Sequence, residues 1–140
     1  MLRITWLWYV CQYTRVKKKG GRIMDGKLSI TYVPVRDLKS SLKFYRDQLG
    51  LEEAWRMGDS TVAFKLPGTD IELMIDLFEE GAPDTVGPMF LIPSVDAFYA
   101  ANQGTMEFVR KPADIPPGRW ATVKDPSGNC LYFYDSSKSQ

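Results

Sequence analysis

The spacing of apolar residues at positions 38–49 predicts an amphipathic helix. Apolar side chains recur there at intervals of four, three and four residues, which places them along one side of a helix: Leu38, Leu42, Tyr45 and Leu49. Asp37 stands at the expected N-cap, where a carboxylate accepts hydrogen bonds from free backbone amides. Gly50 is suited to the left-handed conformation that ends many helices. The apolar residues 28–35 before this helix predict a strand.

The rest of the chain repeats this order, from a strand to a helix and then to three strands. In the first unit, strands are predicted at residues 28–35, 53–57, 61–66 and 70–77. In the second unit, a strand at 89–92 and a short helix at 95–102 precede strands at 107–111, 119–124 and 130–134. Turn-forming residues separate these elements. We therefore expect an α+β fold of two βαβββ units, about residues 27–80 and 86–136, within a single domain that covers residues 24–140.

Two runs in this pattern are characteristic of a known fold family. Residues 35–45 carry the pattern V-x-D-L-x-x-S-L-x-F-Y, and residues 125–134 are an Asp-Pro-Ser-Gly turn followed by an aromatic strand. In this order and at this separation, the chain from residue 27 to 135 resembles the vicinal oxygen chelate superfamily. That superfamily contains glyoxalase I, the bleomycin resistance proteins, the fosfomycin resistance enzymes and the extradiol dioxygenases. The resemblance implies that curved mixed sheets form a cup, with the helices on its convex side and the site on its concave side.

Strand alternation then assigns side chains to the two faces of the sheet. In strand 70–77, the odd-numbered Ile71, Leu73 and Ile75 form an apolar face suited to helix packing, so Glu72 and its even-numbered neighbours face the cup. The same alternation places Ile30 and Tyr32 toward the cup. In strands 89–92 and 130–134, the resemblance sets the alternation through the Ser-Val-Asp run at residues 94–96 and the Asp-Pro-Ser-Gly turn. The following side chains are expected in the cup: Ile30, Tyr32, Glu72, Met74, Asp76, Phe90, Ile92, Cys130, Tyr132 and Tyr134.

The residues at the family's metal-ligand positions argue against a metal site. Metalloenzymes of the superfamily place one ligand at each of four cup positions, which by resemblance are Ile30, Glu72, Phe90 and Tyr132. Only Glu72 has a carboxylate, and the chain contains no histidine. A divalent first-row metal needs about three or more protein donors. We therefore expect no metal and no cofactor. An all-carboxylate site for a hard cation, made of Glu72, Asp76 and a residue such as Glu107, is the alternative.

Apolar and aromatic side chains take the place of the missing ligands. An apolar cavity with a few polar groups is the usual form of a small-molecule site, and aromatic faces stack on planar or cationic ligands. The expected ligand-binding residues are Ile30, Tyr32, Trp55, Met74, Phe90, Ile92, Trp120, Tyr132 and Tyr134. Two alternatives stay open: the same side chains are ordinary core, or Trp55 and Trp120 belong to a dimer interface.

Glu72 is the candidate catalytic residue. A lone carboxylate in an apolar cup can serve as a general base or pair with a basic ligand. Alternatively, it forms a salt bridge with a cationic side chain such as Arg56, Lys65 or Arg119. Cys130 has no histidine to activate it and is interpreted as a small buried side chain, and Arg110 with its neighbour Lys111 as a solvated strand edge.

Composition narrows the class of protein. With 140 residues, 44% of them hydrophobic, the chain can bury one ordinary core. Its two cysteines have no metal-binding or disulfide spacing, which favours a reducing cytoplasmic location. Six of the 18 Lys and Arg residues lie in residues 1–23, where there is no acidic residue, so the remainder is mildly acidic. Nucleic acid is therefore not an expected partner.

Residues 1–23 raise a separate question. Their apolar run at positions 4–11 is far shorter than the roughly 20 residues that span a bilayer, so a membrane is not an expected partner. Lys19-Gly20-Gly21 can be encoded by a bacterial ribosome-binding sequence at a suitable distance before Met24. We therefore expect Met24 to be the natural start. The alternative is a genuine N-terminal extension, such as an added strand, because the apolar run needs a partner.

Two functional hypotheses follow. The first is a metal-free binding protein, similar to the bleomycin resistance proteins, that holds a planar or hydrophobic ligand in its aromatic cup. The second is a glyoxalase-like lyase or isomerase that uses Glu72 as a base or as a metal ligand. The absence of histidine favours the first, whether as an antibiotic resistance determinant or as a protein that binds a metabolite. By resemblance, we also expect a homodimer.

Overall fold

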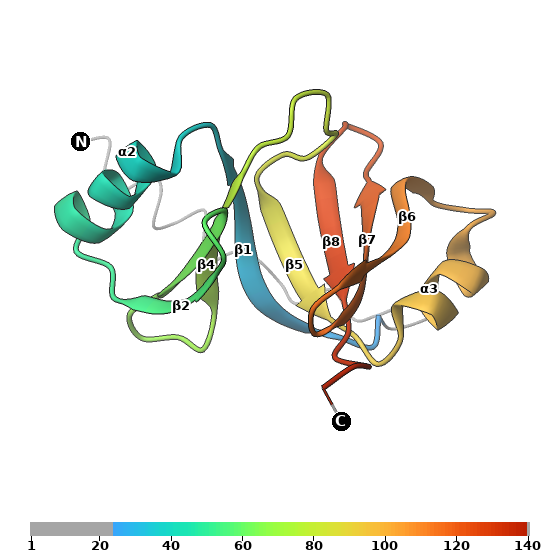
Figure 1. The fold of residues 1–140 in the computed structure, drawn as a ribbon. Helices are drawn as coiled ribbons and strands as arrows, with labels where there is room; N and C mark the ends of the chain where they lie inside the picture. Colours follow the sequence, from blue (N-terminus) through green and yellow to red (C-terminus); the bar gives the residue numbers. More distant parts are fainter. Residues whose placement is uncertain (1–23, 140) are drawn as a thin grey trace, which may run out of the picture.

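A computed structural model describes residues 24–139; the predictions for residues 1–23 lie outside this range. The first unit comprises β1 (Lys27–Val35), α2 (Leu38–Leu42), η1 (Lys43–Gln48), β2 (Glu53–Met57), β3 (Thr61–Lys65) and β4 (Glu72–Leu77). The second unit comprises β5 (Gly87–Leu91), α3 (Val95–Asn102), β6 (Glu107–Ile115), β7 (Gly118–Lys124) and β8 (Cys130–Tyr134). Figure 1 shows α2 beside the strands of the first unit and α3 beside those of the second.

All eight strands form one mixed sheet in the order β2-β3-β4-β1-β5-β8-β7-β6. Within each unit the first strand pairs in parallel with the last, β1 with β4 and β5 with β8. The two units join through the antiparallel pair β1 and β5. Gly87 permits the close approach of β5 to β8, because a Cβ atom there would lie 2.1 Å from the carbonyl oxygen of Cys130. The predicted α+β architecture of two βαβββ units is confirmed.

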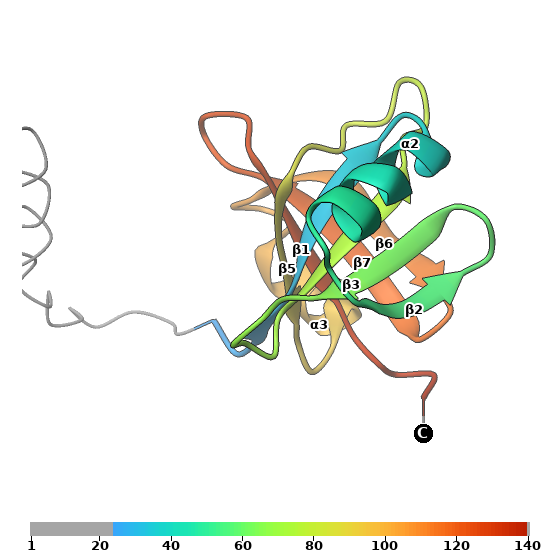
Figure 2. The same cartoon turned by 90° about the vertical axis from the view of Figure 1, so that its left-hand side faces the viewer.

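The helix of the first unit begins where the sequence predicts and changes form midway. Asp37 caps it by accepting a hydrogen bond from the Ser40 amide at 2.9 Å. After Leu42 the helix widens into the π-helix η1, whose last turn is closed by the amide of Leu49 donating to the carbonyl of Phe44 at 2.9 Å. Leu38, Leu42 and Tyr45 of the predicted stripe pack on a buried cluster formed by Val35, Val62, Phe64 and Ile75, whereas Leu49 is exposed. Figure 2 shows α2 on the outside of the strands.

The helix of the second unit is held by a column of aromatic rings. Ser94 caps α3 by accepting from the Ala97 amide at 3.2 Å. Phe98 of α3 stacks on Phe133 of β8 with ring centroids 4.4 Å apart, and Phe133 stacks on Phe90 of β5 at 5.6 Å. Within residues 24–139, the helices are too short or too polar to cross a bilayer.

Asp135 ties the end of β8 to the start of α3 and to β7. Its buried carboxylate accepts four hydrogen bonds, from the amides of Val95 (2.8 Å), Arg119 (2.9 Å) and Ser137 (3.2 Å) and from the Ser137 hydroxyl (2.7 Å). Burial alone would raise the pKa of Asp135, but these hydrogen bonds outweigh burial and hold the pKa below its ordinary value.

We expect Asp135→Ala to lower the free energy of unfolding by about 2–4 kcal/mol, because it leaves buried amides without acceptors. Since the pKa of Asp135 is lower in the folded state, its stabilisation is complete above the unfolded pKa of about 4 and is lost as the pH falls through the folded pKa. Urea unfolding at pH 7 and below pH 4 measures both effects. Asp47→Ala, which removes an exposed ion pair with Arg46, is the control and should leave stability nearly unchanged. An unchanged stability of Asp135→Ala at pH 7 would contradict the prediction.

Candidate functional site

The sheet face opposite the helices carries a cluster of apolar and aromatic side chains. Its buried members are Ile30, Tyr32, Ala63, Met74, Met89, Cys130 and Tyr132, and Trp55, Val109, Trp120 and Tyr134 pack against them partly exposed. We call this set the aromatic face. The two other buried clusters contain the helix-packing residues and lie on the opposite side of the sheet. The aromatic face therefore occupies the side on which the resemblance placed the functional site.

The pairing of strands gives this face an internal symmetry. Ile30 of β1 stands opposite Glu72 of β4, and Met89 of β5 stands opposite Tyr132 of β8. Ile30 and Met89 also face one another across the β1/β5 pair. These four residues occupy equivalent places in the two units. The second-unit counterpart of Ile30 is therefore Met89 rather than Phe90.

The prediction that Phe90 and Ile92 face the cup is wrong. Both pack in the helix-side cluster, Phe90 against Phe133, and Ile92 beside Val95. The prediction makes Phe90 the counterpart of Ile30, but Phe90 lies six residues before Asp96 whereas Ile30 lies seven residues before Asp37; the residue seven before Asp96 is Met89. The predicted assignment is therefore displaced by one residue, and a shift of one residue exchanges the two faces of a strand.

Aromatic rings form the centre of the face. The rings of Tyr32 and Tyr132 lie 4.5 Å apart between centroids, and Trp120 stacks on Tyr132 at 6.4 Å with planes inclined by 14°. Burial, reinforced by the charge of Asp76, raises the pKa of Tyr32, and burial likewise raises the pKa of Tyr132. Both phenols are therefore neutral hydrogen-bonding groups at physiological pH.

Two carboxylates of β4 point to this face. Glu72 Oε2 accepts from Trp55 Nε1 at 2.7 Å. Asp76 accepts from the hydroxyls of Thr61 at 2.5 Å and Tyr32 at 3.1 Å. Within residues 24–139, neither carboxylate has a cationic partner. The face thus holds two negative charges that are hydrogen-bonded but not neutralised by a side chain.

The predicted alternative, a salt bridge from Glu72 to a nearby cation, is wrong. Each of the three candidate cations pairs with another carboxylate: Arg56 with Glu53, Lys65 with Glu52, and Arg119 with Asp96 and Asp114. Glu72 instead shares its hydrogen bond with an indole that belongs to the aromatic face.

Arg110 is the site residue that the sequence analysis assigned wrongly. Its guanidinium forms two parallel hydrogen bonds to the carboxylate of Asp84, at 2.8 and 2.9 Å, and lies 4.1 Å from the ring centre of Trp120. Its side chain is 21% exposed and that of Asp84 only 7%, so this is a largely desolvated ion pair rather than a solvated edge. Burial lowers the pKa of Arg110, but Asp84 more than compensates and raises it overall.

The segment between β4 and β5 packs onto the aromatic face beside this ion pair. Tyr132 donates its hydroxyl proton to the Thr85 carbonyl at 2.6 Å and accepts from the Thr85 amide at 2.9 Å. The thiol of Cys130 donates to the carbonyl of Pro83 at 3.2 Å. Together with the ion pair of Asp84 and Arg110, these contacts fix residues 83–85 against β6 and β8.

The donor set does not fit the metal that the fold family implies. Of the four equivalent positions, Ile30 has no donor atom, Met89 has only a thioether, and the Tyr132 hydroxyl is engaged with Thr85. Among residues 24–139, no three His, Cys, Asp or Glu side chains lie close enough to hold a metal ion together. Glu107, proposed above as a third carboxylate, instead borders a groove on the helix side.

Comparison with known proteins agrees with this fold. Residues 27–133 match the model of the Glyoxalase/Bleomycin resistance protein/Dioxygenase superfamily. A search of curated protein sequences gives no match.

Several solved structures have a similar fold. One is titled an NAD-dependent benzaldehyde dehydrogenase from Legionella pneumophila, with 17% identity, a TM-score of 0.64 and coverage of 77% of this chain and 98% of that one. A superfamily member from Vibrio splendidus has 16% identity, a TM-score of 0.56 and coverage of 79% and 98%. Methylmalonyl-CoA epimerase from Mycobacterium tuberculosis has 16% identity, a TM-score of 0.55 and coverage of 84% and 93%. At these identities the similarity concerns the fold alone.

We expect Arg110→Lys to lower the free energy of unfolding by about 1–3 kcal/mol, because lysine can neither form the paired hydrogen bonds to Asp84 nor stack in the same way on Trp120. A double-mutant cycle with Asp84→Asn, followed by urea unfolding, measures the coupling. Arg46→Lys, in an exposed pair, is the control and should leave the free energy of unfolding nearly unchanged. Equal losses for the two lysine variants would show that the Arg110 pair is an ordinary surface contact.

Proposed function

This chain belongs to the Glyoxalase/Bleomycin resistance protein/Dioxygenase superfamily, and we propose that it binds a small planar or hydrophobic ligand on its aromatic face without a metal ion. The observation that carries the proposal is the composition of the four equivalent positions, Ile30, Glu72, Met89 and Tyr132. Three of them lack an available hard donor, while stacked aromatic rings lie beside them. A rigid aromatic surface with a few fixed polar groups suits binding of a flat molecule.

Partly exposed residues at the edge of the face would make the contacts. Tyr32 and Tyr132 are almost fully buried, whereas Trp55, Trp120 and Tyr134 are partly exposed. The ring of Trp120 is covered on one side by Arg110. A ligand would therefore stack on the exposed parts of these rings.

The charge of the face indicates which planar ligands bind best. Glu72 and Asp76 are charged groups without a cationic partner among the described residues, whereas Arg110 is neutralised by Asp84. A planar cation would gain both stacking and charge attraction. We therefore propose a planar ligand that carries a protonated amine or a similar positive charge.

A lyase or isomerase reaction that uses Glu72 is the second candidate. One oxygen of Glu72 accepts from Trp55, and no other hydrogen bond to this carboxylate is present among residues 24–139. A carboxylate fixed in this way beside an apolar surface can accept a proton from a bound substrate. This candidate shares its binding site with the first and differs from it only in turnover.

The binding proposal predicts that thioflavin T, a planar cation, binds more tightly than the aromatic anion 8-anilinonaphthalene-1-sulfonate. Titration calorimetry should give one site per chain. Trp120→Leu should weaken binding, and Glu72→Gln should weaken the cation about tenfold, equivalent to roughly 1.4 kcal/mol. Phe44→Ala, an exposed aromatic on the helix side, is the control and should leave both affinities unchanged.

Binding that resists Trp120→Leu, or that Phe44→Ala reduces equally, would place the dye elsewhere on the molecule. Tighter binding of the anion than of the cation would contradict the proposal that the ligand is positively charged. The effect of Trp120→Leu on binding of either dye tests separately whether the ligand stacks on this ring.

The metal-free part of the proposal predicts less than stoichiometric metal in untagged protein after incubation with nickel, zinc, manganese and iron salts, because the four positions supply too few donors. Elemental mass spectrometry measures the content. Lyase and isomerase assays on the same samples should give no turnover. About one tightly bound metal per chain, or turnover abolished by Glu72→Gln, would instead support the second candidate.

A further inference from the structure

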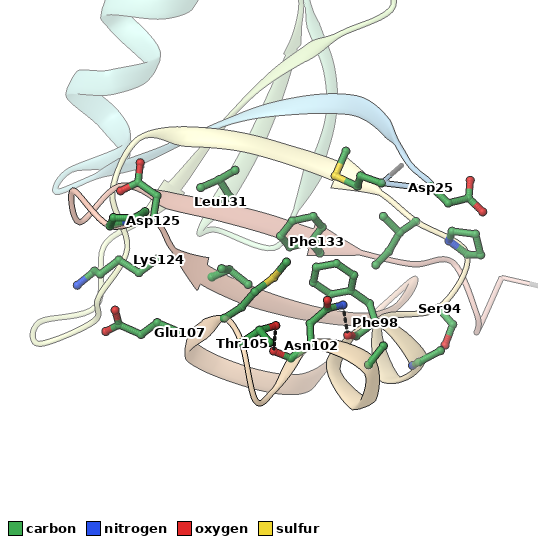
Figure 3. Close-up of a pocket in the computed structure, with 18 residues that line it drawn as sticks. Asp25, Ser94, Phe98, Asn102, Thr105, Glu107, Lys124, Asp125, Leu131 and Phe133 are labelled. Atoms are coloured by element: carbon green, nitrogen blue, oxygen red, sulfur yellow. Dashed lines mark hydrogen bonds between the residues drawn. The ribbon is translucent and has the colours of Figure 1, made fainter. Parts of the chain in front are cut away.

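The helix side of the second unit contains a groove that the proposed ligand site does not use. It lies between α3 and the strands β7 and β8 and has a volume of about 800 Å³ (Figure 3). Its surface is mainly apolar, and its lining includes Ala97, Phe98, Val123, Leu131 and Phe133. We call it the α3 groove. It lies across the sheet from the aromatic face, because Phe98, Val123 and Phe133 belong to the helix-side cluster.

A difference between the two units produces this groove. In the first unit, α2 and η1 provide five and six residues, and large side chains such as Leu42 and Tyr45 cover the sheet. In the second unit, α3 has only eight residues and presents Ala97 and Ala101 to the groove. Shorter cover and smaller side chains leave apolar surface of Leu131 partly exposed. Covering such a surface with an apolar segment removes apolar area from water and stabilises the folded protein.

The chain itself passes along this groove before β1 begins. Met24 and Asp25 contribute to the lining, and Figure 3 shows Asp25 at one end. The backbone at Gly26 lies against Ile92, since a Cβ atom on Gly26 would be 2.7 Å from the Ile92 side chain. Residues 1–23 therefore attach to the described chain at the groove.

The sequence of residues 1–23 is complementary to the groove. Residues 6–10 are Trp-Leu-Trp-Tyr-Val, and residues 15–22 contain five Lys or Arg and no acidic residue. The edge of the groove carries the acidic Asp25, Glu107 and Asp125 and the basic Lys124. Apolar residues thus match the apolar lining, and basic residues match an edge with an excess of negative charge.

For the chain that carries residues 1–23, the alternative to a start at Met24, we propose that residues 6–10 bind in the α3 groove of their own chain, with the basic residues 15–22 along its acidic edge. The thirteen connecting residues 11–23 can span about 40 Å when extended, so the return to the groove is within reach. The groove has room for several large side chains. Aromatic side chains from this segment would bury the exposed parts of Phe98 and Leu131, and would thereby cover sheet surface that α3 leaves exposed.

The test uses the full 140-residue chain with a nitroxide attached to Cys11. Cys130 is 1% exposed and should not react, and Cys11→Ala is the labelling control. In ¹⁵N-labelled protein, we expect loss of the amide signals of Ala97, Ala101 and Thr105, with recovery on reduction of the nitroxide. Ala101→Trp, which fills the groove, should restore these signals by displacing the segment. Trp6→Ser combined with Trp8→Ser should do the same without altering the groove.

Three results would overturn the proposal. The first is retention of the α3 signals in the labelled protein. The second is equal loss around Tyr134, on the aromatic face. The third comes from a mixing experiment, in which chains that carry the nitroxide but no ¹⁵N are combined with ¹⁵N chains that carry no nitroxide. The proposal is overturned if the ¹⁵N chains lose the same signals to the same extent. That result would assign the groove to the segment of a second copy.

Discussion

The pairing of β1 with β5 is the contact on which the rest of this structure depends. It joins two four-stranded units into one sheet and brings Ile30 opposite Met89. Glu72, the partner of Ile30 in β4, and Tyr132, the partner of Met89 in β8, thereby occupy equivalent positions in the two units. The pairing is irregular at one point, where its register shifts between Leu28 and Ile30. Because a shift of one residue exchanges the faces of a strand, this irregularity determines which side chains of β1 and β5 share a face. Residues of both units of the chain thereby contribute to the aromatic face.

Most of the fold could be predicted from the sequence because its signals are local. The cap at Asp37, the stripe from Leu38 to Tyr45 and the alternation in β4 each act within a few residues. The same alternation placed Ile30, Tyr32, Met74 and Tyr132 on the correct face. It failed at Phe90 and Ile92, because Phe90 lies six residues before Asp96 rather than the seven that separate Ile30 from Asp37. Local patterns predicted the elements, but an error of one residue in the register of a short strand exchanges its faces.

Arg110 could not be predicted because its surroundings are not local. Its partner Asp84 lies 26 residues away in the segment between β4 and β5, and Trp120 lies on another strand. The register of β6 against β7 shifts on both sides of Arg110, between Phe108 and Arg110 and again between Arg110 and Ala113. Strand alternation therefore gives no information about the face of Arg110. A basic pair on a predicted edge strand resembles a solvated edge until the partner carboxylate is placed.

The distribution of burial determines how the proposed site would discriminate between ligands. Tyr132 and Tyr32 are almost completely buried in the free protein, so a ligand would not have to order them and would gain little area from them. Discrimination would instead come from the partly exposed Trp55 and Trp120 and from the charges of Glu72 and Asp76. Trp120 contacts both Tyr132 and Arg110, and Arg110 in turn is fixed by Asp84. In the proposed site, the ion pair of Arg110 and Asp84 would therefore act on ligand binding through the position of one indole ring.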